Sequence, residues 1–344
     1  MYESFAKTME INKQKLVDYI NKLPEAKVLV IGDLAIDEMI CGDTERISRE
    51  APVLILNHTK TDIVLGAAAN AAHNASTINN GKVSVLGVVG DDYQSEQLKN
   101  AFNMANIDCS GLVEEKGRKT VTKTRISGAC SQSVTQQIVR IDRQTKAPIK
   151  HETENLLISN IEKCVPEYDT IILSDYHIGV LTQKVIDKTI EVANKYNKTI
   201  VADAQKDLDK YKNITSMTPN LPDTQKFVKF ELSSQDKIIE AGKLIIDKTN
   251  AKSVLVTCGS DGMVSINSNG QTDIIPVFNR SMVFDVTGAG DTVTAIYSMG
   301  LAIGAGPLYA AIIGNIAASI VIKQFGCATT TVDEILKAIE NINL

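Results

Sequence analysis

Short apolar runs alternate with helix-like segments along most of this chain. The runs are AKVLVIGDLAID, KVSVLGVVG, TIILSDY, KTIVADA and SVLVTCGSDG, and each has the length of a buried strand. Helical patterns lie between and after them, at residues 67–79, 93–105, 182–194, 234–250, 291–303 and 307–323. Apolar strands that alternate with helices predict parallel βαβ units, and therefore an α/β fold.

Two segments break this pattern. Residues 38–64 and 117–142 are richer in Thr, Ser and charge, alternate like strands and offer no good helix. We interpret them as strands outside the main sheet that form a lid or a dimerisation flap. Residues 1–25 predict a short amphipathic helical extension that ends near Pro24, and residues 26–344 predict the main domain.

Composition narrows the class of partner. The chain has 344 residues, of which 44% are hydrophobic, enough for one large domain. A net charge of -5 gives no basic field for nucleic acid or anionic membranes, so we expect small-molecule partners. There is no secretory h-region and no apolar stretch long enough to span a bilayer, and the six cysteines are scattered. We therefore expect a cytoplasmic protein with reduced thiols and, with four dispersed histidines, no zinc site.

The octapeptide DVTGAGDT, residues 285–292, carries the clearest chemistry. Gly288, Ala289 and Gly290 bring successive backbone N–H groups to a predicted helix start, which is an anion-binding arrangement. Asp291 follows at once, where a carboxylate beside a bound phosphate suits a proton acceptor for an attacking hydroxyl. The alternative is a favourable charge in the first turn of a helix. The chain has no P-loop motif, and its first strand lacks a dinucleotide fingerprint.

DVTGAGDT resembles the signature of the ribokinase-like (PfkB) carbohydrate kinases. The resemblance runs from about residue 27 to 335 and includes VLVIGDLAID, GAAANAAHNA, LSDYHIGVL and TPNLPD in order. It implies an α/β three-layer sandwich with a mostly parallel central sheet and a small β lid. The set is most similar to the D-glycero-β-D-manno-heptose-7-phosphate kinases, which phosphorylate the anomeric hydroxyl with ATP. The chain length predicts the kinase part alone, without the nucleotidyltransferase to which many such kinases are fused.

The resemblance also implies site residues. Asp291 corresponds to the catalytic base, and residues 288–290 to the anion hole. The implied sugar-binding set is Asp33, Asp37, Gly66, Asn70, Lys123, Arg125 and Asp175. The implied ATP-binding set is Asn220, Asp223, Thr257, Gly259 and Asn315, with Mg²⁺ bound through the phosphates near Asn220 and Asp223. A monovalent cation such as K⁺ is implied near Asp285, Thr287 and Gly326.

Several of these residues have a plainer alternative. Asp33 and Asp37 follow a strand and can accept hydrogen bonds from a sugar diol, but capping and turn chemistry remain open. Lys123 and Arg125 can hold a distal phosphate or be solvated lid charges. Packing alone is an equal alternative for Thr257, Gly259 and Asn315.

The chain also departs from the heptose kinases. Ile178 and Gln205 stand where those kinases usually carry lysines, and Ala67 replaces the second glycine of a Gly-Gly pair. A lysine–phosphate contact is charge-assisted and contributes about 1.5–3 kcal/mol. Two alternatives therefore stay open: a kinase for an unphosphorylated hexose or nucleoside, and a weakly catalytic kinase-like binding protein. Lid strands that pair between two subunits would make a homodimer.

Overall fold

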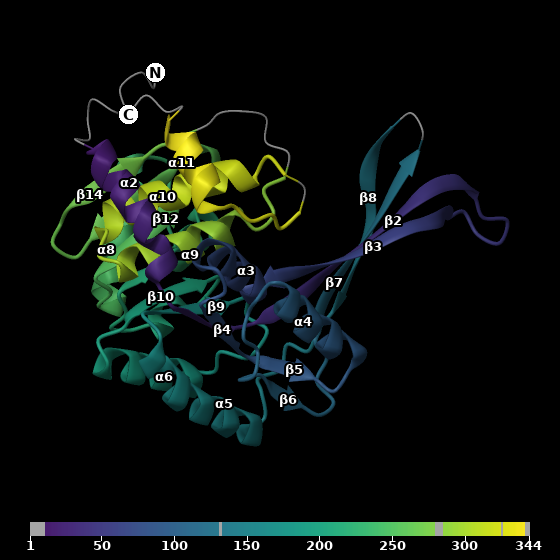
Figure 1. Ribbon diagram of the computed structural model, residues 1–344, viewed down its shortest axis with the longest axis horizontal. Coiled ribbons are helices and arrows are strands. Elements are labelled where there is room, and N and C mark those ends of the chain that lie inside the picture. The colour runs from purple at the N-terminus through teal and green to yellow at the C-terminus, as the bar shows by residue number, and fades with distance from the viewer. Residues whose placement is uncertain (1–10, 131–132, 279–284, 325, 341–344) are drawn as a thin grey trace.

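An eight-stranded sheet runs through the body of the protein, with helices on both faces, and a second sheet projects away from it (Figure 1). The computed structural model describes residues 11–130, 133–278, 285–324 and 326–340. The strand order of the main sheet is β14-β13-β12-β11-β10-β9-β1-β4. Neighbours from β12 to β4 are parallel, whereas β12–β13 and β13–β14 are antiparallel. In chain order, these strands are β1 (Val28–Gly32), β4 (Val83–Leu86), β9 (Thr170–Asp175), β10 (Thr199–Ala204), β11 (Ser216–Met217), β12 (Ser253–Thr257), β13 (Met263–Asn267) and β14 (Thr272–Ile275).

The strands are apolar along their whole length because helices cover both faces of the sheet. On β1, Val28 and Val30 enter one hydrophobic core, while Leu29 and Ile31 enter the core on the opposite face. The first core is covered by α2 (Lys13–Lys22), α3 (Ala68–Asn79), α4 (Tyr93–Met104), α9 (Ala289–Ala302), α10 (Gly306–Val321) and α11 (Val332–Glu340). The second core is covered by α5 (His151–Cys164), α6 (Gln183–Lys195), α7 (Leu221–Val228) and α8 (Gln235–Thr249). This is a three-layer sandwich.

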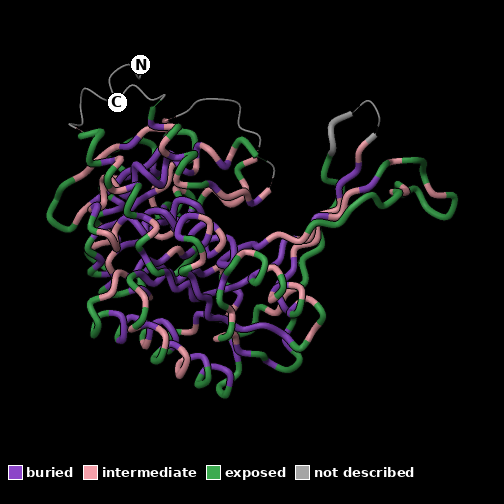
Figure 2. The backbone as a smooth tube through the Cα atoms, viewed as in Figure 1, coloured by how far each residue is buried: buried purple, intermediate pink, exposed green. Residues whose placement is uncertain are grey.

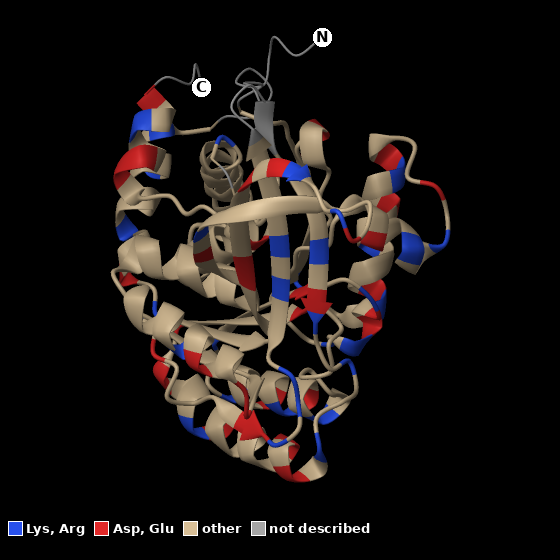
Figure 3. Ribbon diagram, turned by 90° about the vertical axis from the view of Figure 1, so that its right-hand side faces the viewer, with Lys and Arg blue, Asp and Glu red and all other residues tan. Residues whose placement is uncertain are grey.

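Four long strands form the projecting sheet, which we call the lid sheet. They are β2 (Leu34–Ile47), β3 (Leu54–Ala67), β7 (Val121–Cys130) and β8 (Ser133–Arg143), in the order β3-β2-β7-β8. The outer half of the lid sheet is largely exposed, whereas its inner end joins the buried body (Figure 2). Lys, Arg, Asp and Glu are spread along its strands (Figure 3). A further parallel pair, β5 (Val88–Gly90) and β6 (Val113–Glu115), lies below it.

The α/β fold with a mostly parallel sheet and a β lid is therefore confirmed. The exact domain limits, 1–25 and 26–344, stay predictions, and parts of both ranges lie outside the described residues. Within the described part of the extension, α2 packs Leu16 and Ile20 into the first core. The helix patterns missed α5, α7 and α11. No helix in the described ranges is both long and apolar enough to cross a membrane.

Candidate active site

The glycine turn lies where the chain enters α9. Gly288 is the N-cap of this helix and has a φ of 81°, a left-handed conformation that glycine adopts without strain. A Cβ at this position would lie 2.5 Å from Asn70 Nδ2, so glycine is also required by close packing. The N–H groups of Gly290 and Asp291 have no hydrogen-bond acceptor among the described residues. They lie in the first turn, where the helix dipole favours an anion.

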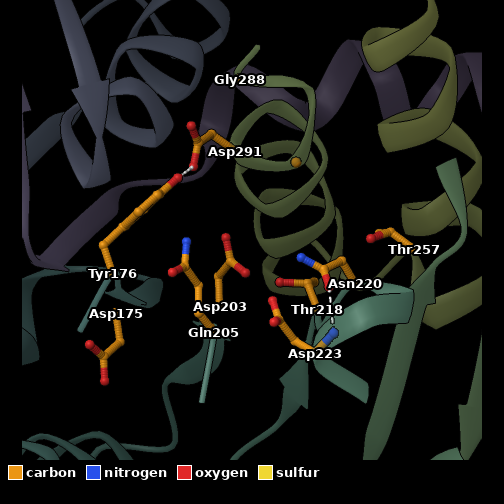
Figure 4. A pocket seen from close by; sticks show the side chains of 11 residues that line it. Asp175, Tyr176, Asp203, Gln205, Thr218, Asn220, Asp223, Thr257, Gly288 and Asp291 are labelled. Atoms are coloured by element: carbon orange, nitrogen blue, oxygen red, sulfur yellow. Dashed lines mark hydrogen bonds between the residues drawn. The ribbon is translucent and has the colours of Figure 1, made fainter. Parts of the chain in front are cut away.

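Asp291 is buried in the first turn of α9, and both of its carboxylate oxygens accept hydrogen bonds. Tyr176 Oη donates to Oδ1 at 2.7 Å, as Figure 4 shows, and Asn70 Nδ2 donates to Oδ2 at 2.8 Å. Burial raises the pKa of Asp291 to about 6, although these hydrogen bonds and Lys123 oppose that rise. The carboxylate is thus oriented, partly desolvated and still able to accept a proton near neutral pH.

A cavity of about 130 Å³ lies on the sheet side of the glycine turn, and we call it the sheet-side cavity (Figure 4). Its walls are the carboxyl ends of strands and two helix starts, the usual ligand position in an open α/β sheet. The lining residues are Asp175, Tyr176, Asp203, Gln205, Thr218, Asn220, Asp223, Thr257, Gly288, Gly290 and Asp291. The structure therefore brings Asp291 together with Asn220, Asp223 and Thr257 of the implied ATP-binding set. Asp175, which the resemblance implied for the sugar, lies in the same cavity.

Asp203 is a site residue that the sequence analysis did not single out. It is the penultimate residue of β10, two positions before Gln205, and burial together with Asp291 raises its pKa to about 7. Its sequence signal is the position at the carboxyl end of an apolar strand, the rule already applied to Asp33. Tyr176 and Thr218 were missed as well, because hydroxyl residues at strand ends have no distinctive spacing.

Asn220 holds the start of α7. Its side chain accepts a hydrogen bond from the Asp223 N–H at 2.8 Å, and Asp223 Oδ1 lies 3.0 Å from Lys226 Nζ. The Asn-x-x-Asp spacing thus forms a helix cap that also presents amide and carboxylate oxygens to the cavity.

A second cavity of about 480 Å³ lies between the glycine turn and the lid sheet, and we call it the lid-side cavity. Alternate residues of the paired strands line it, because side chains two apart share one face of a strand. The register sets Asp37 opposite Val64, Met39 opposite Asp62 and Cys41 opposite Lys60. The lining residues are Asp37, Met39, Cys41, Lys60, Asp62, Val64, Arg125, Ser127, Gln137, Asp285, Thr287, Gly326 and Cys327.

The two acidic residues after β1 differ sharply. Asp37 lines the lid-side cavity, but Asp33 lines neither cavity and is 1% exposed. The Asp33 carboxylate accepts backbone hydrogen bonds from Tyr176, Ile178 and Val180, at 3.0, 3.0 and 3.3 Å. Of the two alternatives for Asp33, these contacts support turn chemistry, since they hold the loop after β9.

Other predicted residues also have structural contacts instead of a place in a cavity wall. Asn315 Nδ2 donates to the Pro276 carbonyl at 2.7 Å, and the residue is 3% exposed. Gly259 begins a short turn with a φ of 58° and does not line either cavity. Gly66 lies under Asp37, and Lys123 Nζ lies 5.2 Å from the centre of the Tyr176 ring. Of the two residues that stand in place of the usual lysines, Ile178 is buried, whereas Gln205 lines the sheet-side cavity.

The comparison with solved structures defines the class of fold. Phosphofructokinase-2 from Escherichia coli, in complex with substrates and products, superposes with a TM-score of 0.74 at 18% identity, covering 93% of this chain and 100% of that one. Arabidopsis thaliana ribokinase with ribose and ATP gives a TM-score of 0.68 at 14% identity, over 92% and 99%. The fold is therefore ribokinase-like.

The chain belongs to the pfkB family of carbohydrate kinases, whose family model matches residues 25–334. It is thus an ATP-dependent carbohydrate kinase, and the resemblance seen in the sequence is confirmed. The bifunctional protein HldE of Aliarcobacter butzleri is 37% identical over 90% of this chain, and HldE of Helicobacter hepaticus is 36% identical over 91%. The chain spans 63% and 64% of the length of these two relatives.

Proposed function

We propose that the protein transfers the γ-phosphate of ATP to the anomeric hydroxyl of a heptose 7-phosphate. The observation that carries this proposal is Asp291, a buried carboxylate that lines the sheet-side cavity beside the open N–H groups of the first turn of α9. ATP would occupy the sheet-side cavity with its terminal phosphate at residues 288–290. The sugar would occupy the lid-side cavity, and its acceptor hydroxyl would lie at Asp291. The similarity to HldE proteins favours a heptose over other sugars.

The chain's own residues supply the chemistry as follows. Asn70 and Tyr176 hold the two oxygens of Asp291, each of which keeps a lone pair for a substrate hydroxyl. Asp291 takes the hydroxyl proton as the oxygen attacks the γ-phosphorus, and the bond from that phosphorus to the bridging oxygen of ADP breaks. The open N–H groups of Gly290 and Asp291 hold the phosphoryl oxygens in line, whereas the Ala289 N–H donates to the Val286 carbonyl at 3.2 Å.

The sheet-side cavity fits Mg²⁺ carried by the nucleotide. Four of its lining residues are aspartates, and none of its lining residues is Lys or Arg. No group of three or more His, Cys, Asp or Glu in the described ranges is arranged as a metal site by itself. Asn220 and Asp223 would therefore hold the ion through water while ATP supplies the remaining oxygens. The ion would neutralise phosphate charge in a cavity that offers no cationic side chain.

Two further features belong to this proposal. A monovalent cation near Asp285 and Thr287 is supported because hydrogen bonds from Thr287 and Gly326 outweigh burial and lower the pKa of Asp285. This carboxylate therefore stays ionised beside the turn. A homodimer through the lid sheet is supported by exposed apolar side chains on its strands. They are Ile47, Leu54, Ile138, Val139 and Ile141.

The second candidate is a kinase for an unphosphorylated hexose or a nucleoside. It is favoured by Gln205, which lines the sheet-side cavity in place of one usual lysine, and by the buried Ile178, which stands in place of the other. Asp37, Asp62 and Asp285 also give the lid-side cavity one more carboxylate than it has cations, Lys60 and Arg125.

A substrate screen tests the proposal. Sugar-dependent ADP release would be measured with heptose 7-phosphate, fructose, fructose 6-phosphate, ribose and adenosine, and ³¹P NMR would identify the phosphorylated position. We expect the highest kcat/KM for heptose 7-phosphate, with an anomeric phosphate in the product. A preference for an unphosphorylated compound would establish the second candidate, and ATP binding without any release of ADP would contradict both.

A further inference from the structure

Asp37 is held on three sides at the wall of the lid-side cavity. It is 5% exposed, and Gly66 lies beneath it, where a Cβ would come within 3.0 Å of its Cγ. Its Oδ2 accepts a hydrogen bond from Cys327 Sγ at 3.5 Å. Its Oδ1 lies 3.5 Å from Arg125 Nη1, yet neither of these two buried atoms has a hydrogen-bond partner among the described residues. An acceptor and a donor thus stand side by side at the cavity wall as an ion pair, and neither has a hydrogen bond.

Cys327 links this carboxylate to the glycine turn. Its neighbour Gly326 donates its N–H to Asp285 Oδ2 at 3.0 Å, and the other oxygen of Asp285 accepts the Thr287 N–H at 2.9 Å. Cys327 Sγ also lies 3.3 Å from the position that a Cβ on Gly288 would take. The thiol is therefore packed between the cavity carboxylate and the anion-binding turn.

The thiol is suited to donate and not to ionise. Burial, together with the carboxylates of Asp37 and Asp291, raises the pKa of Cys327 well above the ordinary range. A neutral S–H is a weak donor, but here it is aimed at one oxygen of a buried carboxylate. With Oδ2 occupied and Gly66 beneath, Oδ1 is the carboxylate oxygen left without a hydrogen bond, beside Arg125 Nη1.

We propose that Cys327 is a positioning residue for the sugar. Its thiol holds Asp37 so that Oδ1 accepts from one hydroxyl of a vicinal diol while Arg125 Nη1 donates to the adjacent oxygen. This inference rests on the proposed function, because it takes the lid-side cavity as the sugar site. The ligand class that it requires is a polyol with neighbouring hydroxyl groups.

Three substitutions at Cys327 separate donation from packing. Cys327→Ser keeps a donor, Cys327→Val keeps most of the volume, and Cys327→Ala removes both. We expect the Val and Ala variants to raise the KM for the sugar roughly 5–30-fold, the loss of one hydrogen bond to a charged group. The kcat and the KM for ATP should stay within about 2-fold, and the Ser variant should recover most of the sugar affinity. Cys164→Ala on α5, outside both cavities, is the matched control and should change nothing.

Two outcomes would overturn the inference. One is an unchanged sugar KM in the Val and Ala variants. The other is that sugar affinity, ATP affinity and melting temperature all fall together, which would show that Cys327 contributes through packing alone. Asp37→Asn, measured in parallel, separates this failure from that of the proposed function. If Asp37→Asn raises the sugar KM and Cys327→Val does not, only the role of Cys327 fails. If neither raises it, the lid-side cavity is not the sugar site.

Discussion

The two cavities beside the glycine turn are built in different ways. The sheet-side cavity takes its polar groups from strand ends and helix starts of the main sheet, where packing on both faces holds them. The lid-side cavity takes most of its groups from alternate positions on β2, β3 and β7, strands that extend away from the body. Under the proposed function, the chemistry rests on the main sheet, while selection of the sugar depends on the lid sheet. Substitutions should divide accordingly, with turnover lost on one side and sugar affinity on the other.

Gly288→Ala should produce the largest change among the substitutions that test this division. The added Cβ meets Asn70, and alanine would have to adopt the positive φ of this position. The turn and the Asn70–Asp291 contact should therefore both shift. We expect kcat to fall about 10²–10³-fold, the usual cost of a disturbed anion hole. Gly270→Ala is the control, because it also has a positive φ, of 90°, but no atom within 4 Å of its Cβ. Equal losses of activity in both variants would show that backbone strain alone is responsible.

Arg125→Ala should act on the other side of the division. Removal of a buried guanidinium that faces the lid-side cavity should raise the sugar KM roughly 10–100-fold and leave the KM for ATP unchanged. Arg140→Ala is the matched control, because Arg140 pairs with Arg125 across β7 and β8 but is bound to Asp142 at the surface. Steady-state kinetics with both substrates varied would measure both effects. A change confined to the KM for ATP would contradict the assignment of Arg125 to the sugar in the lid-side cavity.

The pH dependence should report on the sheet side. The pKa of Asp291 is raised to about 6, and the base must be ionised to act. We expect kcat/KM to be level above about pH 7 and to fall about tenfold per pH unit below 6. The pH profile of the Asp203→Asn variant should keep this fall at acidic pH. Its disappearance in that variant would assign the titration to Asp203.

Asp203→Asn should have the smallest effect, and on stability. The pKa of Asp203 is raised to about 7 in the folded protein, so the folded state binds more protons than the unfolded chain between about pH 4 and 7. The carboxyl therefore costs stability as the pH rises through this window, and the cost is complete above it. We expect the amide to raise the melting temperature by roughly 2–4 °C at pH 8 and much less at pH 4. Thermal melts at the two pH values would measure the difference, and an equal shift at both would contradict it.

The distance along the chain between contacting residues explains what could be predicted from the sequence. The glycine turn and Asp291 form a local unit, so consecutive residues were enough to predict it. Five strands of the main sheet, β1, β4, β9, β10 and β12, were predictable because they are apolar on both faces, whereas β11, β13 and β14 were missed. Asp33 and Asp37 could not be separated, because the partners of Asp33 are backbone groups at 176–180, far along the chain. Asp203 and Cys327 were missed for the same reason, since their partners come from other elements.

Turnover by Asp291→Asn tests the central claim most directly. The variant would be compared with the unsubstituted protein for sugar-dependent ADP release, with ATP and sugar affinities measured by calorimetry. Loss of a positioned proton acceptor predicts that kcat falls about 10²–10⁴-fold while both affinities remain within a few-fold. A variant that turns over the sugar at close to the original rate would contradict the role of Asp291, and with it the assignment of the glycine turn as the catalytic centre.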